Sequence, residues 1–118
     1  MVAYNIRVTD ALRSSDYHFD KIDIAAAGDS SAVVIPAVAG KQIVVIGGLI
    51  ICSAAITLNL EDGAGLDFTG GLTLGTDAKG FAIPPDPTGQ FVTGEGEGLV
   101  INYNGTAQIS GWLKWKVM

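Results

Sequence analysis

The most apolar stretch of the chain, residues 41–60, alternates between hydrophobic and polar positions only in its second half. In residues 43–52 both sets of alternating positions are apolar, with Ile43, Val45, Gly47, Leu49 and Ile51 on one side and Val44, Ile46, Gly48, Ile50 and Cys52 on the other. From Ile56 onward, apolar residues alternate with Thr57, Asn59 and Glu61, a pattern typical of a strand with one buried face. We therefore predict two strands joined by a tight turn at residues 53–55, the first of which needs cover on both faces.

Shorter alternating runs, separated by turns rich in glycine, proline and aspartate, occupy most of the remaining chain. We expect strands or strand fragments at residues 19–25, 31–36, 66–68, 72–74, 80–83 and 90–93. In the second of these, Val33 and Ile35 are expected on one face and Val34 on the other. With the end of the chain this makes about eight strands and no long helix. The pattern predicts an all-β fold, an antiparallel β-sandwich in jelly-roll order. An immunoglobulin-like order is less favoured, because a single cysteine cannot form the disulfide typical of that fold.

The end of the chain has the strongest turn signal. Asn104-Gly105 is the preferred pair for a type I′ turn, because both central positions of that turn need positive φ. We expect a hairpin of residues 99–103 and 106–117 around it. On the second strand Leu113 and Trp115 belong to the apolar face, and Trp112 belongs to the opposite face.

The first 20 residues carry no sustained pattern. We expect residues 1–20 to form an extended N-terminal arm and residues 21–118 to form the sandwich domain. The short apolar alternation of Tyr4, Ile6 and Val8 would allow the arm to pair with a partner. A first strand of the sandwich and a frayed end are the alternatives.

Composition narrows the range of functions. Only 16% of the 118 residues are charged, which is low for a soluble monomer and suggests that a partner buries part of the surface. The net charge of −5 argues against binding of nucleic acid. Cys52 lies in the apolar stretch, where a free cysteine acts as a small hydrophobe. We find no apolar leader and no membrane span, and we expect synthesis and assembly in a cytoplasm.

Candidate chemistry is sparse. His18, the one histidine, follows Ser14, Ser15 and Asp16, but neighbours in sequence do not make a catalytic triad. Glu61, Asp62 and Asp67 in one loop and Glu95 and Glu97 in another could bind calcium, yet their spacing does not match an EF-hand loop. We interpret both groups as solvated acidic turns. We predict no enzymatic activity, no catalytic residue, no metal site and no cofactor.

Trp112 is the most informative single residue. An exposed tryptophan is enriched at protein interfaces and at platforms that bind glycans. The other interpretations are that the register is off by one residue or that lysine side chains cover the ring.

The order of several segments resembles small jelly-roll virion proteins of tailed bacteriophages, including capsid decoration (cement) proteins. The resemblance covers roughly residues 30–118. It rests on the strand and turn patterns at residues 39–41, 57–60, 71–74, 80–84, 94–102 and 109–115. It implies a structural protein that oligomerises on a capsid or a tail, and it implies no catalytic residue.

We therefore expect a virion protein, assembled in the host cytoplasm, that decorates and stabilises a capsid by oligomerising and bridging shell subunits. The expected partners are the major capsid protein or other virion proteins and further copies of the chain, as a dimer or trimer, with neither nucleic acid nor membrane. Many modest contacts of this kind would add up to tight attachment. The candidate interface residues are Tyr4, Ile6, Val8, Val44, Ile46, Ile50 and Trp112.

Two other functions stay open. One is a jelly-roll binding module of a phage tail or fibre that recognises host surface glycans through Trp112, Tyr103 and the acidic loops. The other is a hydrolase or lyase, which would need a pair of carboxylates facing each other across a groove.

Overall fold

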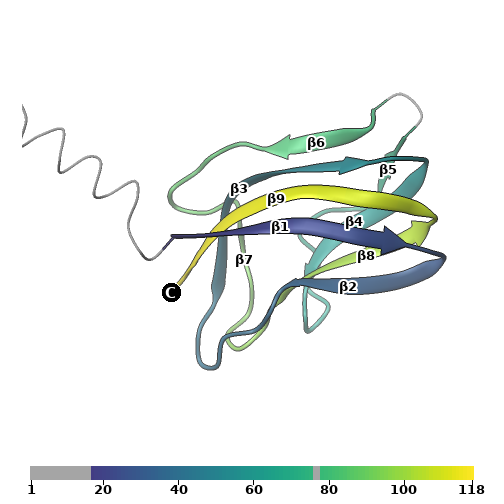
Figure 1. Cartoon of the computed structure of the whole chain (residues 1–118). Coiled ribbons are helices and arrows are strands. Elements are labelled where there is room, and N and C mark those ends of the chain that lie inside the picture. Colours follow the sequence, from purple (N-terminus) through teal and green to yellow (C-terminus); the bar gives the residue numbers. More distant parts are fainter. Residues whose placement is uncertain (1–16, 76–77) are drawn as a thin grey trace, which may run out of the picture.

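The computed structural model describes residues 17–75 and 78–118 and places their nine strands in two antiparallel sheets (Figure 1). Sheet A contains β1 (Tyr17–Ala26), β9 (Ala107–Val117), β3 (Ile43–Cys52) and β6 (Gly80–Ile83), in that order, and β7 (Phe91–Val92) also pairs with β3. Sheet B contains β2 (Asp29–Ile35), β8 (Leu99–Gly105), β4 (Ile56–Asp62) and β5 (Leu72–Leu74). The prediction of an all-β sandwich is confirmed.

The strand pairing is that of a jelly roll. β1 pairs with β9, β2 pairs with β8, and β4 pairs with β5. Strands from the two ends of the chain therefore pair with each other, as in a long hairpin that is folded into two sheets. β6 and β7 pair with different parts of β3, at Gly48–Ile51 and at Val44–Val45. β6 and β7 together occupy the position of one strand at the edge of sheet A, so the nine strands correspond to the eight strands of a jelly roll.

The core lies between the two sheets and is almost wholly aliphatic. β4 and β9 supply it as the alternation predicts, with Leu58, Leu60, Ile109 and Leu113 fully or almost fully buried. Trp115 closes one part of the core from β9, and Cys52 is buried as a small apolar side chain whose thiol donates to the carbonyl oxygen of Lys79.

β-bulges make two predicted face assignments wrong. In β3 the register shifts between Val45 and Gly47, so that Ile43 and Val45 face the core in the first half and Ile50 and Cys52 in the second. An extra residue in one strand reverses the alternation beyond it. Ile50 is therefore a fully buried core residue with no surface to offer to a partner.

The bulge in β2 has the same effect. The register shifts between Val33 and Ile35, which leaves Val33 65% exposed while Ile35 is fully buried. The two side chains therefore do not share a face, contrary to the prediction.

The predicted hairpin at Asn104-Gly105 is also wrong. β8 pairs with β2 and β4 in sheet B, whereas β9 pairs with β1 and β3 in sheet A, so these residues carry the chain from one sheet to the other. Gly105 has a φ of 136°, but no residue other than glycine has positive φ in the described part of the chain. A type I′ turn needs positive φ at Asn104 as well.

The second face of β3 is covered in part by the chain itself. The proline-rich loop of residues 84–90 crosses the outer face of sheet A, where Asp86 N donates to Ile46 O over 2.9 Å and Gln90 N donates to Val45 O over 2.7 Å. Gly89 packs so closely on Val44 that a Cβ there would overlap its side chain. Val44 and Ile46, two of the predicted interface residues, are consequently buried within one copy.

β1 changes the predicted domain boundary. Residues 17–20, expected in the N-terminal arm, are the first residues of β1, so the sandwich begins at Tyr17 rather than at residue 21. Tyr4, Ile6 and Val8 lie outside the described residues. Of the expected strand at residues 66–68, only a single bridge between Asp67 and Glu61 is present. The described residues contain no helix long and apolar enough to cross a membrane.

Candidate binding site on the outer face of sheet A

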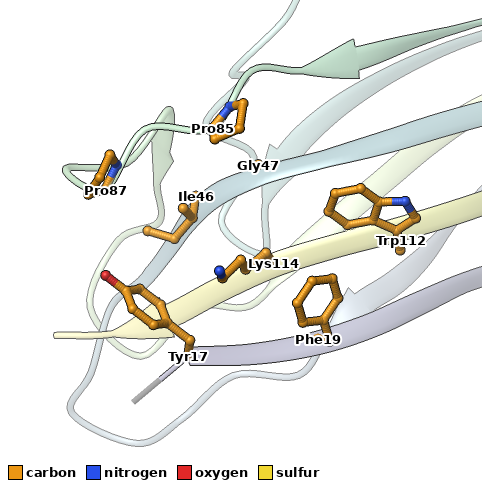
Figure 2. A pocket seen from close by; sticks show the side chains of 8 residues that line it. All are labelled: Tyr17, Phe19, Ile46, Gly47, Pro85, Pro87, Trp112 and Lys114. Atoms are coloured by element: carbon orange, nitrogen blue, oxygen red, sulfur yellow. The ribbon is translucent and has the colours of Figure 1, made fainter. Parts of the chain in front are cut away.

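A cleft of about 260 Å³ lies on the outer face of sheet A, where the proline-rich loop ends and the open sheet begins (Figure 2). Figure 2 shows aromatic rings from β1 and β9 on one side and two proline rings from the loop on the other, with β3 between them. The lining residues are Tyr17, Phe19, Ile46, Gly47, Pro85, Pro87, Trp112 and Lys114.

Strand register brings the aromatic residues together. Phe19 lies opposite Lys114, and Trp112 lies opposite Lys21 in the β1–β9 ladder, so Phe19 and Trp112 are diagonal neighbours on one face. Their ring centroids are 5.4 Å apart at an angle of 40°. Phe19 is 65% exposed and Trp112 is 40% exposed, although such rings are usually buried. The prediction that Trp112 points away from the core is confirmed.

The opposite wall of the cleft depends on a glycine and on a closed loop. A Cβ on Gly47 would lie 3.2 Å from Ile83 O and 3.3 Å from the Cα of Pro85, so glycine lets the loop approach the sheet. Asp86 Oδ1 accepts hydrogen bonds from Thr88 N at 2.9 Å and from Thr88 Oγ1 at 2.6 Å. These bonds hold the pKa of Asp86 below its ordinary value and give the loop a defined shape.

Lysine side chains form the polar rim of the cleft. Lys114 Nζ lies 4.9 Å from the ring centroid of Tyr17 and 5.8 Å from that of Phe19, and Lys116 Nζ lies 5.9 Å from the ring of Tyr17. Cations attach to aromatic faces in this way while their heads stay in water. With Lys21, three of the five lysines in the sequence lie on this face of a chain whose net charge is −5. The site is therefore an apolar cleft with a cationic rim, suited to an acidic partner surface.

His18 lies near the start of β1 and is exposed, with one aromatic contact. Its ring stacks on Trp115 with the centroids 4.4 Å apart, and Trp115 Nε1 donates to Asp20 Oδ2 over 3.1 Å. These contacts account for His18 and Asp20 as structural residues at one end of the sandwich. Residues 14–16, considered with His18 as a possible triad, lie outside the described residues.

Asp62 is not a solvated acidic residue, contrary to the prediction. Its side chain is 2% exposed and accepts hydrogen bonds from the backbone N–H groups of Ala64, Leu66 and Gly94 at 2.9–3.0 Å. Burial is the largest single influence on its pKa and acts to raise it, but these donors and Gly65 together outweigh burial and the pKa lies below its ordinary value. Because Gly94 follows β7 and Asp62 ends β4, this carboxylate joins the two sheets.

The other acidic residues do not form a binding centre with it. Asp67 accepts a hydrogen bond from the amide of Asn59 at 3.0 Å, and Glu61, Glu95 and Glu97 are partly or fully exposed. In residues 17–75 and 78–118, no three side chains of His, Cys, Asp or Glu are grouped as metal ligands.

Of the predicted interface residues, Ile46 and Trp112 line the cleft, Val44 lies beneath the loop and Ile50 lies in the core. Tyr103, suggested with Trp112 for glycan binding, packs against the core from β8 in the other sheet. Six lining residues were not predicted: Tyr17, Phe19, Gly47, Pro85, Pro87 and Lys114. The alternation of residues 19–25 already put Phe19 on a face with Lys21, but no pattern showed which loop would meet it.

Comparison of the chain with protein-family models, with curated proteins and with solved structures gives no match.

Proposed function

We propose that this protein is a structural virion protein of a tailed bacteriophage that decorates and stabilises the capsid by oligomerising and bridging shell subunits. The observation that carries the proposal is the apolar, lysine-rimmed cleft on the outer face of sheet A. Apolar patches of this kind on small soluble proteins mark interaction sites. Its aromatic anchors and cationic rim fit an acidic protein surface better than a small polar substrate.

The jelly-roll architecture supports the same function. The two sheets form a stiff slab whose core is independent of the cleft, since Phe19 and Trp112 lie outside the core cluster. A stiff slab that presents one adhesive face can span the seam between two shell subunits. Repeated over many copies, a modest interface gives strong attachment.

Location in the particle is the first test. We expect antibodies against the protein to label the heads of virus particles purified from the source culture, as seen by electron microscopy with gold conjugates. Label on tails would favour the glycan-binding alternative. Particles without any label would contradict both.

Binding is the second test. The purified protein should sediment with undecorated capsid shells from the same particles, and Phe19→Ala or Trp112→Ala should weaken that binding about tenfold or more, because truncated aromatic anchors typically cost about 2 kcal/mol. Val33→Ala is the matched control, since Val33 is as exposed as Phe19 but lies on sheet B. Equal effects of Phe19→Ala and Val33→Ala would exclude the cleft as the attachment site.

Glycan binding is the second candidate, favoured by the three aromatic residues that share the cleft. Sugar rings stack on such side chains, but they also need several hydrogen-bonding groups. The cleft supplies the hydroxyl of Tyr17 and the ammonium group of Lys114. Binding to a glycan array that disappears in Trp112→Ala would support this function over attachment to a shell.

A further inference from the structure

β1 differs from the other edge strands of the sandwich. It runs for ten residues, pairs with β9 without any register shift, and has no second partner among the described strands (Figure 1). The other edges are blunted: β2 has a bulge and is followed by Pro36, while β5 and β6 have three and four residues. Short strands, bulges and prolines are common protections against strand pairing, and β1 has none of these three.

We propose that two copies of this chain pair through the free edges of β1, antiparallel and around a two-fold axis, with Ile22 of one copy opposite Ile22 of the other. Strand addition of this kind satisfies the unpaired backbone groups of both edges. A two-fold axis makes the interface self-complementary, so each contact occurs twice.

The charge pattern on β1 selects this register. Phe19, Lys21, Asp23 and Ala25 face outward on alternate residues, with Lys21 and Asp23 both exposed. With Ile22 at the axis, Lys21 of each copy lies opposite Asp23 of the other, and Phe19 lies opposite Ala25. Two ion pairs form between directly opposed residues, and a large ring meets a small side chain.

The neighbouring registers are unfavourable. Moving the axis by one residue toward the N-terminus places Lys21 opposite Lys21, and moving it by one residue the other way places Asp23 opposite Asp23. Like charges directly opposite each other on paired strands are destabilising. Asp23 Oδ1 also accepts a hydrogen bond from the Gln108 amide at 2.6 Å, which orders the carboxylate before pairing.

This dimer specifies the oligomer on which the proposed function rests. An axis perpendicular to the sheet keeps the outer faces of both copies on the same side, because residues 19, 21, 23 and 25 of both strands share one face. Sheet A becomes continuous across the two copies, and both aromatic clefts point in one direction. Two clefts on one rigid face allow bivalent attachment to a repetitive surface.

Charge exchange tests the proposal on the full chain. Size exclusion with light scattering should give the mass of a dimer for the natural protein. Lys21→Asp and Asp23→Lys, each alone, should raise the dissociation constant about tenfold or more, because each replaces two attractive pairs with two repulsive ones. The double variant should restore the dimer. Lys41→Asp changes the charge equally on an exposed loop and should have no effect.

A zero-length carbodiimide crosslink gives the register directly. In a mixture of unlabelled and ¹⁵N-labelled protein, we expect a crosslinked peptide pair that joins Lys21 of one isotope to Asp23 of the other. A monomer at all concentrations, a dimer indifferent to the single variants, or a double variant that stays monomeric would overturn the proposal.

The test of the β1 dimer and the test of binding to capsid shells can fail independently of each other. A monomer that sediments with capsid shells would remove the β1 dimer, and with it the oligomerisation in the proposed function, but would leave attachment to the shell in place. A dimer that responds to charge exchange but binds no shell would do the reverse.

Discussion

The outer faces of the two sheets are built on the same alternation but differ in chemistry. Sheet B presents a ladder of small polar side chains in which Thr57 lies opposite Asn104 and Thr73, and Asn59 lies opposite Asn102. Sheet A presents Tyr17, Phe19, Ile51 and Trp112 among lysines. An antiparallel sheet needs cover on one face only, and sheet B is of that kind.

The difference between the two outer faces accounts for the position of the candidate binding site. The loop of residues 84–90 covers Val44 and Ile46 but leaves Ile51 44% exposed and Phe19 and Trp112 more than one third exposed. The cleft lies at the edge of this loop, between the covered and the exposed part of the outer face of sheet A. The candidate binding site thus lies where the chain buries only part of an apolar face.

The largest difference between the sheets in their contribution to stability is expected at the centre of sheet A, from the substitution Gly111→Ala. Gly111 has a φ of 145°, and a Cβ there would overlap the carbonyl oxygen of Leu49 on β3. The β3–β9 ladder would have to separate, so we expect a loss of about 4 kcal/mol or more in the free energy of unfolding, measured with urea.

Gly28→Ala is the control for that variant. Gly28 has a φ of 79° in a turn, and no atom lies within 4 Å of the position of its Cβ. The substitution should cost only about 1 kcal/mol of backbone strain. Equal losses for both variants would mean that Gly111 does not pack against β3.

The assignment of Ile50 to the core is tested by Ile50→Ala. We expect a loss of about 2–5 kcal/mol in unfolding free energy, close to that of Leu58→Ala in sheet B, because both side chains are completely or almost completely buried. Denaturation of the two variants side by side measures this. A loss below 1 kcal/mol for Ile50→Ala, with the expected loss for Leu58→Ala, would contradict the burial of Ile50 and would indicate a surface position.

Asp62, which joins the sheets, should make their connection depend on pH. Its pKa is lower in the folded protein than in the unfolded chain, where it is about 3.9, so its stabilisation is complete above the unfolded pKa and is lost as the pH falls from there through the lower pKa of the folded protein. Asp62→Asn should cost about 1–3 kcal/mol at pH 7 and less at pH 3. Thermal unfolding at both pH values measures it, and an equal cost at both would contradict the role of the ionised carboxylate.

Among the side chains tested, Trp112 should contribute least to stability, as measured with Trp112→Ala. The ring is 40% exposed and contacts Phe19 at the surface, so the loss should be below about 1.5 kcal/mol. Trp115, 9% exposed, is then the remaining tryptophan, and the fluorescence maximum should move to shorter wavelength. An unchanged maximum would show that Trp112 is as buried as Trp115.

Much of the fold could be predicted from the alternation, and the site only in part. Strands with one apolar face, such as β4 and β9, have one favourable orientation, because a slip by one residue exposes the whole core set. The doubly apolar β3 has no such preference, so its bulge and the burial of Ile50 were not predictable. The Asn104-Gly105 signal is local, whereas the pairing of β8 and β9 with different sheets depends on distant strands.

The sequence by itself determined the all-β class, the outward position of Trp112 and the need to cover the second face of β3. These follow from period-two patterns and turn residues, which act over a few neighbouring positions. Only the tertiary structure decided that the proline-rich loop covers Val44 and Ile46, that Phe19 meets Trp112, and that Asp62 is buried between the sheets. Each of these joins segments far apart in the chain, and no local pattern encodes which of them will meet.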